Sequence, residues 1–335
     1  MENPKHRATW AQERLRLGQA NVGAWVLAAV AVVVARPDIP WTEACGLFIV
    51  LQLPFDVVGG WWLPRRHDRA EDTRAWPLRW LRGVLVHGGL MWSLGTLALA
   101  LGPEAGLLAL GVAGVMLMAV QGALVKLVGT GHDRSFSGGW VGLPGLERMI
   151  HPARWTGLAR DVAERRRVLA VESGARARGV IAALAFNLTG LVIVAAWDGA
   201  GTASSAQLIG LAAGTSLWSF LGLLTLPTLS RHAVHALDAL AAAELGSDRV
   251  AQAILALERD QEAEHERPRS IGQVFYPVPA PAARLAALDR APPRRFAWRV
   301  ARSALFASQG QLSWLSRAVH CNSGRPELWM LPPGD

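Results

Sequence analysis

The sequence alternates long apolar runs with short arginine-rich segments, and this alternation leaves few folds open to the chain. A helix that crosses the roughly 30 Å hydrocarbon layer of a bilayer needs about 20 apolar residues. Six runs approach or reach that length, the first being the shortest, and they cover residues 20–35, 41–61, 83–101, 105–128, 180–197 and 206–226. The expected fold class is therefore mainly α, a polytopic α-helical membrane protein with about six spans.

Composition favours a membrane protein over a nucleic-acid-binding one. Of the 335 residues, 51% are hydrophobic and 18% are charged, which is more apolar than an ordinary soluble domain. The formal net charge is +8, but the arginines flank the apolar runs and do not form one basic face with interleaved aromatic residues. We therefore expect membrane lipid as a partner, and no nucleic acid.

The basic residues also predict an orientation, because the cytoplasmic flanks of membrane helices collect arginine and lysine. The connection between the second and third runs holds six arginines, whereas the connections at 102–104 and 198–205 hold no basic residue. This pattern predicts a multi-pass protein of the cell membrane with both termini in the cytoplasm. It also places the long segment between the fourth and fifth runs in the cytoplasm.

These observations divide the chain into six consecutive parts. The predicted parts are a cytosolic amphipathic lead-in at 1–19, four transmembrane helices at 20–128, a cytosolic hairpin-plus-helix block at 129–178, two transmembrane helices at 179–229, a cytosolic helical part at 230–290 and a C-terminal docking tail at 291–335. In the third part, a glycine-rich turn region at 134–145 and a short strand at 148–152 predict a β-hairpin, followed by a helix over 155–172.

The most specific motif follows the sixth apolar run. Residues 230–246 read SRHAVHALDALAAAELG, and AILAL follows at 253–257. Together with the preceding hairpin and helix, this motif resembles the membrane zinc metallopeptidases of the CAAX prenyl endopeptidase and HtpX heat-shock protease type. Further similarities are Leu53-Pro54-Phe55 at the close of the second run, Tyr276-Pro277, and Arg284-Leu285-x-x-Leu288.

The resemblance implies a small cytosolic α+β metallopeptidase-like domain of the gluzincin type beside the spans. In the family, the hairpin leads into a helix that carries H-E-x-x-H, and its edge strand holds the substrate backbone by strand addition. The two histidines of that motif hold zinc, and the glutamate activates the attacking water. A third ligand, a glutamate, comes from the family motif Ser-Arg-x-x-Glu-x-x-Ala-Asp after the last span.

None of these ligands is present in this chain. No histidine occurs between His151 and His232, and the degenerate motif region contains Glu164, Arg166, Arg167 and Ala170, with Arg166, Arg167 and Ala170 at the expected ligand and base positions. Alignment on Ser230, Arg231 and Asp238 puts Val234 at the position of the third ligand. We expect no catalytic residue at these positions and no cofactor. The arginine cluster is expected instead to take the place of the metal, pairing with Asp238 or Glu164.

A relocated metal site is the alternative that the sequence leaves open. His232 and His235 are three residues apart, and Asp238 follows one turn later, so the three side chains can share one helix face. Zinc bound there would make the chain an active membrane metallohydrolase with relocated ligands.

Two features outside the motif also carry expectations. Asp56 lies at the end of the second run, where a charge is costly unless it is paired or wet, and we expect it to bond neighbouring backbone or to pair with Arg65 or Arg66. The docking tail is expected to pack through its aromatic and leucine residues. Those residues are Trp314, Leu328 and Trp329, and neither Cys45 nor Cys321 indicates a disulfide or a thiolate metal site.

The functional hypothesis from the sequence is a catalytically inactive pseudo-peptidase. It is an integral membrane relative of zinc metalloendopeptidases that acts as a binding or regulatory protein, with a peptide or a membrane protein as its partner. A second alternative, besides the relocated metal site, is a carrier or sensor for lipidated or hydrophobic peptides, which would use an apolar chamber between the spans.

Overall fold

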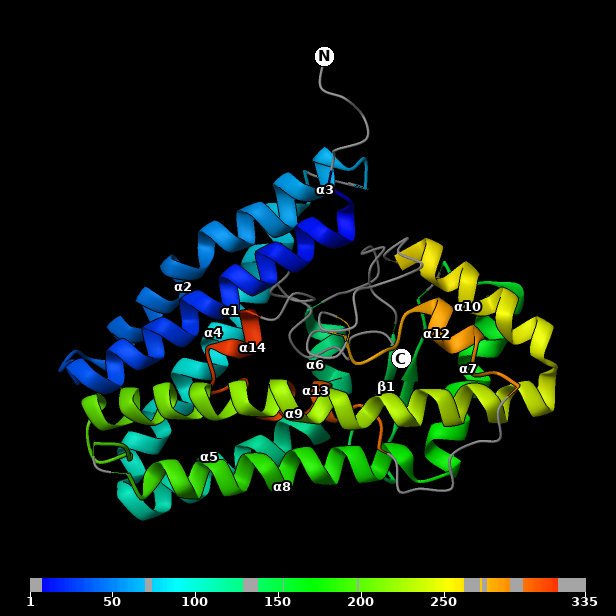
Figure 1. Ribbon diagram of the computed structural model, residues 1–335. Coiled ribbons are helices and arrows are strands. Elements are labelled where there is room, and N and C mark those ends of the chain that lie inside the picture. The colour runs from blue at the N-terminus through cyan, green and yellow to red at the C-terminus, as the bar shows by residue number, and fades with distance from the viewer. Residues whose placement is uncertain are drawn as a thin grey trace.

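The computed structural model describes residues 8–69, 74–128, 138–152, 154–197, 199–261, 272, 276–289 and 298–318, and it is mainly helical (Figure 1). Long apolar helices form a bundle, and shorter helices pack around the far end of helix α9. The bundle elements are α1 (Trp10–Ala35), α2 (Trp41–Val57), η2 (Val58–Trp62), α3 (Leu63–Arg66), α4 (Trp76–Leu101), α5 (Pro103–Ala119), α6 (Gln121–Val128), α8 (Ala175–Ala195) and the first half of α9 (Ser205–Leu245).

The bundle has the length and the surface of a multi-pass membrane protein. Among the described residues, five helical segments are long and apolar enough to cross a membrane, and the bent pair α5–α6 makes a sixth if it counts as one span. Large apolar side chains point outward along these helices, as they do where a helix contacts lipid rather than water. Examples are Leu27, Val34, Leu85, Leu108 and Val192, each more than half exposed.

The structure corrects the predicted fourth span. The sequence predicts one helix over 105–128, but α5 and α6 meet at Val120 with a bend of 69°. The bend turns the start of α6 toward the β-hairpin, where the Gln121 side chain accepts a hydrogen bond of 3.0 Å from the backbone N–H of Gly142. A contact with a turn 21 residues away therefore decides the geometry here, and the apolar run itself carries no break.

Two helices continue past the predicted ends of their spans. The lead-in and the first span are one helix, α1, which starts in a capping box between Thr9 and Gln12 and meets no breaker before Ala35. Likewise, α9 has 41 residues and runs from the Ser204 cap to Gly246, whose φ of 93° ends it. One helix thus carries both the last apolar span and the Ser230–Gly246 motif.

The smaller part of the molecule surrounds the second half of α9. It contains the strands β1 (Gly139–Val141) and β2 (Arg148–Ile150) and the helices α7 (Gly157–Glu172), α10 (Ser247–Gln261) and α12 (Pro281–Leu285). The strands pair antiparallel with Trp140 opposite Met149, so the predicted hairpin and the helix that follows it are confirmed. A separate apolar core joins α7, α9, α10 and the end of α12 through Val162, Leu169, Leu237, Ile254 and Leu288.

The C-terminal segment lies inside the bundle, which corrects the predicted docking tail. Helix α13 (Ala301–Ser308) packs between α5, α8 and α9, and α14 (Leu315–Ala318) packs against α1. Residues 299–318 are all buried, and Trp314 packs on Trp25 with ring centroids 5.6 Å apart. The remainder of the predicted tail, including Cys321, Leu328 and Trp329, lies outside the described residues. We call residues 298–318 the inner segment.

Glycines and polar side chains of the bundle accommodate the inner segment. A Cβ on Gly179 of α8 would lie 1.7 Å from the carbonyl oxygen of Arg299, so the backbones touch only because Gly179 has no side chain. Asn187 donates to the carbonyl of Leu305 at 2.8 Å, and His87 Nε2 lies 2.7 Å from the carbonyl oxygen of Gly310. The inner segment therefore fills space between the spans that the carrier hypothesis assigned to a chamber.

Candidate functional site

Asp238 on α9 is the centre of a buried ionic network at the degenerate motif. Its Oδ1 lies 2.5 Å from Nε of Arg166 on α7. Arg284 on α12 binds the same carboxylate with two donors, Nε to Oδ2 at 2.7 Å and Nη2 to Oδ1 at 2.9 Å. The exposed fractions of the three residues are 1%, 5% and 6%. We call these three residues the Asp238 network.

Helical spacing explains why these side chains meet. On α9, Val234, Leu237, Asp238 and Ala241 follow the i, i+3, i+4, i+7 pattern of one helix face, and all are buried. On α7, the corresponding buried face holds Val162, Ala163, Arg166, Leu169 and Ala170. The two faces pack against each other, so Arg166 of α7 and Asp238 of α9 come together. The predicted pairing of the arginine cluster with Asp238 is therefore confirmed for Arg166.

Electrostatics keep this network ionised at neutral pH. Burial by itself would raise the pKa of Asp238, but Arg166 and Arg284 reverse that effect and lower the pKa from 3.8 to about 2. Burial lowers the pKa of Arg166 to about 10, with Asp238 opposing the shift. Two guanidinium groups face one carboxylate, so the network carries a net positive charge and repels a divalent cation.

The other residues of the degenerate region take separate partners. Glu164 lies on a more exposed face of α7, where Arg160 Nε donates to it at 2.7 Å and His151 Nε2 lies 3.3 Å away. The Arg167 guanidinium lies over the ring of Trp155 at 5.1 Å. Arg165 pairs with Glu244 and Glu172. Glu164 was the second predicted partner of the arginine cluster at 165–167, but in the structure Glu164 accepts its hydrogen bond from Arg160.

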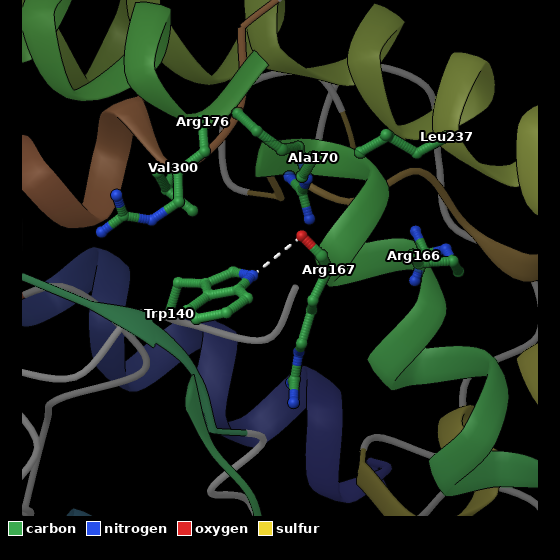
Figure 2. A pocket seen from close by; sticks show the side chains of 8 residues that line it. Trp140, Arg166, Arg167, Ala170, Arg176, Leu237 and Val300 are labelled. Carbon is green, nitrogen blue, oxygen red and sulfur yellow. Dashed lines mark hydrogen bonds between the residues drawn. The ribbon is translucent and has the colours of Figure 1, made fainter. Parts of the chain in front are cut away.

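A very small cavity remains beside the network (Figure 2). Its volume is about 10 Å³, which holds roughly one water molecule. Trp140 of β1 closes one side, and its Nε1 donates to the backbone carbonyl of Arg167 at 2.8 Å. The other lining residues are Arg166, Arg167, Ala170, Arg176, Leu237, Arg299 and Val300. A peptide backbone does not fit into this space.

The hairpin is fixed over this cavity from two sides. Arg176 at the start of α8 donates to the carbonyl of Gly142 at 2.6 Å and to Glu147 at 3.0 Å. Gln121 of α6 holds the N–H of Gly142, as described above. The inner segment enters the bundle beside the same cavity, because Arg299 and Val300 line it.

The relocated metal site is not assembled in the structure. Among the described residues, no three His, Cys, Asp or Glu side chains come together in a way that could hold a metal ion. His232 is exposed and His235 is half-buried, while both oxygens of Asp238 are occupied by guanidinium groups. Burial lowers the pKa of His235, with Arg284 and Arg231 acting in the same direction against Asp238. The structure therefore does not bring His232, His235 and Asp238 together as a ligand set.

The remaining motif positions are structural in this chain. Val234, at the place of the third ligand, is fully buried in the α9 face, and Ser230 is also buried. Arg231 donates to the carbonyl of Gly272 and lies 3.4 Å from the carbonyl oxygen of Tyr276, which ties α9 to the segment before α12. Sequence reasoning missed the role of Arg284, although the Arg-Leu-x-x-Leu pattern marked its helix.

A second buried aspartate lies in the bundle, and its predicted partners are wrong. Asp56 accepts hydrogen bonds from Trp80 Nε1 at 2.8 Å and from Gln52 Nε2 at 3.1 Å, and it pairs with Arg317 of the inner segment. Arg65 and Arg66 instead stack on the rings of Trp61 and Trp62. No local signal could reveal Arg317, which is 261 residues away in the chain.

Comparison with known proteins assigns no family to this chain, so only its architecture describes its class. The chain matches no protein-family model, no curated protein and no solved structure among those compared. Fold and site together define a multi-pass helical protein with a buried Asp–Arg network beside its spans.

Proposed function

We propose that the chain is a catalytically inactive membrane relative of zinc metallopeptidases, in which the Asp238 network replaces the metal centre. The observation that carries this proposal is the ion pair between Arg166 and Asp238. By the resemblance, Arg166 stands at a zinc-ligand position of the α7 motif, and Asp238 belongs to the α9 motif. An arginine that neutralises an aspartate there takes the place of a cation that bridges the same two helices.

The order and packing of the parts support the same proposal. A β-hairpin precedes α7, α7 packs on the motif-bearing half of α9, and two spans separate these two helical segments in sequence. We assign the hairpin, α7, α10, α12 and the second half of α9 to a small cytosolic α+β domain, with both termini on the cytosolic side. The arginine-rich connection between α2 and α4 supports that orientation.

Loss of the metal and closure of the groove favour a binding or regulatory role over hydrolysis. The cavity at the network is too small for a peptide, and Trp140 covers the helix that would carry the catalytic groups. A partner, whether a peptide or a membrane protein, therefore contacts the outer surface of the domain. No observation on the described residues favours the active metallohydrolase, since its proposed ligands are not grouped. None favours the carrier or sensor either, since the inner segment lies between the spans.

Restoring the family ligands tests the proposed ancestry directly. The variant Arg166→His/Arg167→Glu/Ala170→His/Val234→Glu places H-E-x-x-H on α7 and the third ligand on α9. If the helices keep the geometry of a metallopeptidase, this variant binds about one zinc per chain, since three ligands of this type are the usual set of a catalytic site. Elemental analysis of detergent-purified protein measures the zinc, and the wild type is expected to contain none.

A matched control moves the same residue types one position along α7. The variant Arg165→His/Arg166→Glu/Leu169→His/Val234→Glu moves the first histidine to the partly exposed position of Arg165, so the two histidines no longer face Val234 together, and it should bind no zinc. A folded ligand-restored variant without zinc contradicts the ancestry. Chelator-sensitive cleavage of unfolded casein by the wild type contradicts the inactive state.

A further inference from the structure

Arginine and tryptophan side chains gather where α2 ends and where α1 and α4 begin. Residues 61–82 contain six arginines against three acidic residues, Asp68, Glu71 and Asp72. Helix α3 extends from the end of α2 and lies beside the start of α1 (Figure 1). The tryptophans of this region are Trp10, Trp61, Trp62, Trp76 and Trp80. We call the exposed part of this region the Arg–Trp surface, made of Trp61, Trp62, Arg65, Arg66 and Arg82.

Each of the two central arginines is stacked on an indole ring. The guanidinium carbon of Arg65 lies 4.0 Å from the ring centroid of Trp61, and that of Arg66 lies 5.1 Å from Trp62. Each pair is four residues apart, which is the spacing of neighbours on a helix face. An indole ring restricts the guanidinium above it, and the planar N–H fork of a guanidinium matches the oxygens of a phosphate.

The local backbone brings both pairs to the surface together. The turn from Val58 to Trp62 is a π-helix, in which the chain carries one extra residue per turn before α3 begins. Arg65 and Arg66 are exposed on α3, and Arg66 also lies 3.4 Å from Glu13 of α1. This contact fixes α3 against α1, so the two guanidinium groups are held in place before any ligand binds.

Exposed apolar side chains also lie on α4, which packs against α2. On α4, Arg82 is exposed, and Leu78, Leu81 and Leu85 are exposed on the same helix, from 45% to 71%. A charged end next to an exposed apolar face matches a molecule with an anionic head and a hydrocarbon tail. A soluble anion would leave the apolar face uncovered, and tryptophan is typical of the boundary between water and lipid.

We propose that the Arg–Trp surface binds an anionic phospholipid, with Arg65 and Arg66 on its phosphodiester headgroup and its acyl chains along the exposed leucines of α4. This lipid site does not depend on the peptidase ancestry, because it uses neither the Asp238 network nor the β-hairpin. It orients the molecule by holding one end of the bundle to one leaflet.

Selective lipid retention tests the proposal. Full-length protein in detergent is mixed with equal amounts of phosphatidylglycerol and phosphatidylcholine that have the same acyl chains, and native mass spectrometry counts the bound lipids. The wild type is expected to retain phosphatidylglycerol at least 25-fold over phosphatidylcholine, about fivefold for each of the two arginines. At about fivefold per arginine, Arg65→Gln should lower this selectivity about fivefold, and Arg65→Gln/Arg66→Gln about 25-fold.

The controls separate a site from a general charge effect. The variant Arg148→Gln/Arg249→Gln removes two exposed arginines outside the spans and should keep the selectivity of the wild type. Arg65→Gln alone leaves the Arg66–Glu13 contact in place, so it tests the site even if the double variant fails to fold. Equal retention of both lipids by the wild type, equal losses in both double variants, or displacement of the lipid by excess glycerol phosphate would each overturn the proposal.

Discussion

The two buried aspartates, Asp56 and Asp238, are both compensated by arginine, but in different surroundings. Asp56 lies within the bundle and accepts from one guanidinium, that of Arg317, together with the neutral donors of Gln52 and Trp80. Asp238 lies outside the apolar spans and forms ion pairs with two guanidinium groups, those of Arg166 and Arg284. Both carboxylates are 1% exposed.

The difference follows from what each environment can tolerate. Within hydrocarbon, an uncompensated charge is costly, so a pair with zero net charge and neutral donors suits Asp56. Beyond the spans, the excess positive charge of two arginines at one aspartate is tolerated. If either Arg166 or Arg284 is removed, the other still pairs with Asp238. We therefore expect the pair at Asp56 to be the more fragile of the two.

Removal of the cation from Asp56 should have the largest effect. The variant Arg317→Gln leaves the carboxylate with neutral donors inside the bundle, and we expect the free energy of unfolding to fall by about 3–5 kcal/mol. Thermal unfolding in detergent measures the change. The double variant Asp56→Asn/Arg317→Gln removes both charges and should be more stable than Arg317→Gln alone; equal losses would show that charge compensation is not what the pair provides.

Removal of one cation from Asp238 should cost less. In Arg284→Gln, Arg166 still neutralises the carboxylate, so the expected loss is about 1.5–3 kcal/mol for the bidentate hydrogen bonds. The same unfolding measurement applies, with Arg166→Gln/Arg284→Gln as the comparison that removes both cations. A loss of stability as large as that of Arg317→Gln would show that Arg166 alone does not compensate the charge of Asp238.

The Asp238 network should also respond to acid. Its carboxylate has a pKa lowered from 3.8 to about 2, so the folded state binds the proton more weakly than the unfolded state. The stabilisation is therefore fully present above about pH 4 and is lost as the pH falls toward 2, on the order of 2 kcal/mol in total. The stability difference between wild type and Asp238→Asn should shrink over that range; a constant difference would contradict the lowered pKa.

The exposed ion pairs of α7 should contribute least. Glu164 is partly exposed and pairs with Arg160, so water and salt screen the interaction. We expect Glu164→Gln to unfold at the same temperature as the wild type within error. A clear destabilisation would place Glu164 in the buried network, contrary to its position on α7.

Local sequence patterns predicted those contacts of the site that arise from residues on one face of a helix. The hairpin, α7 and the pairing of Arg166 with Asp238 follow from turn residues and from 3.6-residue periodicity, both of which are readable within a short window. The family resemblance supplied the register between α7 and α9. Arg284 was within the recognised pattern, but its partner depended on how α12 docks.

Long-range packing decided what the sequence could not indicate. The break at Val120 and the depth of the inner segment depend on contacts with residues far along the chain, such as Gly142 and Arg317. Ser303, Gln309 and Ser313 look like surface residues in a tail, yet all are buried among the spans. The facing helices bond some of the polar side chains in this segment, since Asn187 donates to Ser308 and Ser219 donates to Gln309.

The position of the inner segment sets an order for biosynthesis. Translation produces the spans before residues 298–318, so His87 and Asn187 enter the bilayer before the groups that they bond exist. The newly inserted helices must therefore stay loosely associated until residues 298–318 have been made. A nascent protein that ends before residue 298 would be a substrate for membrane quality control, because its interior would contain unsatisfied polar groups facing an empty centre.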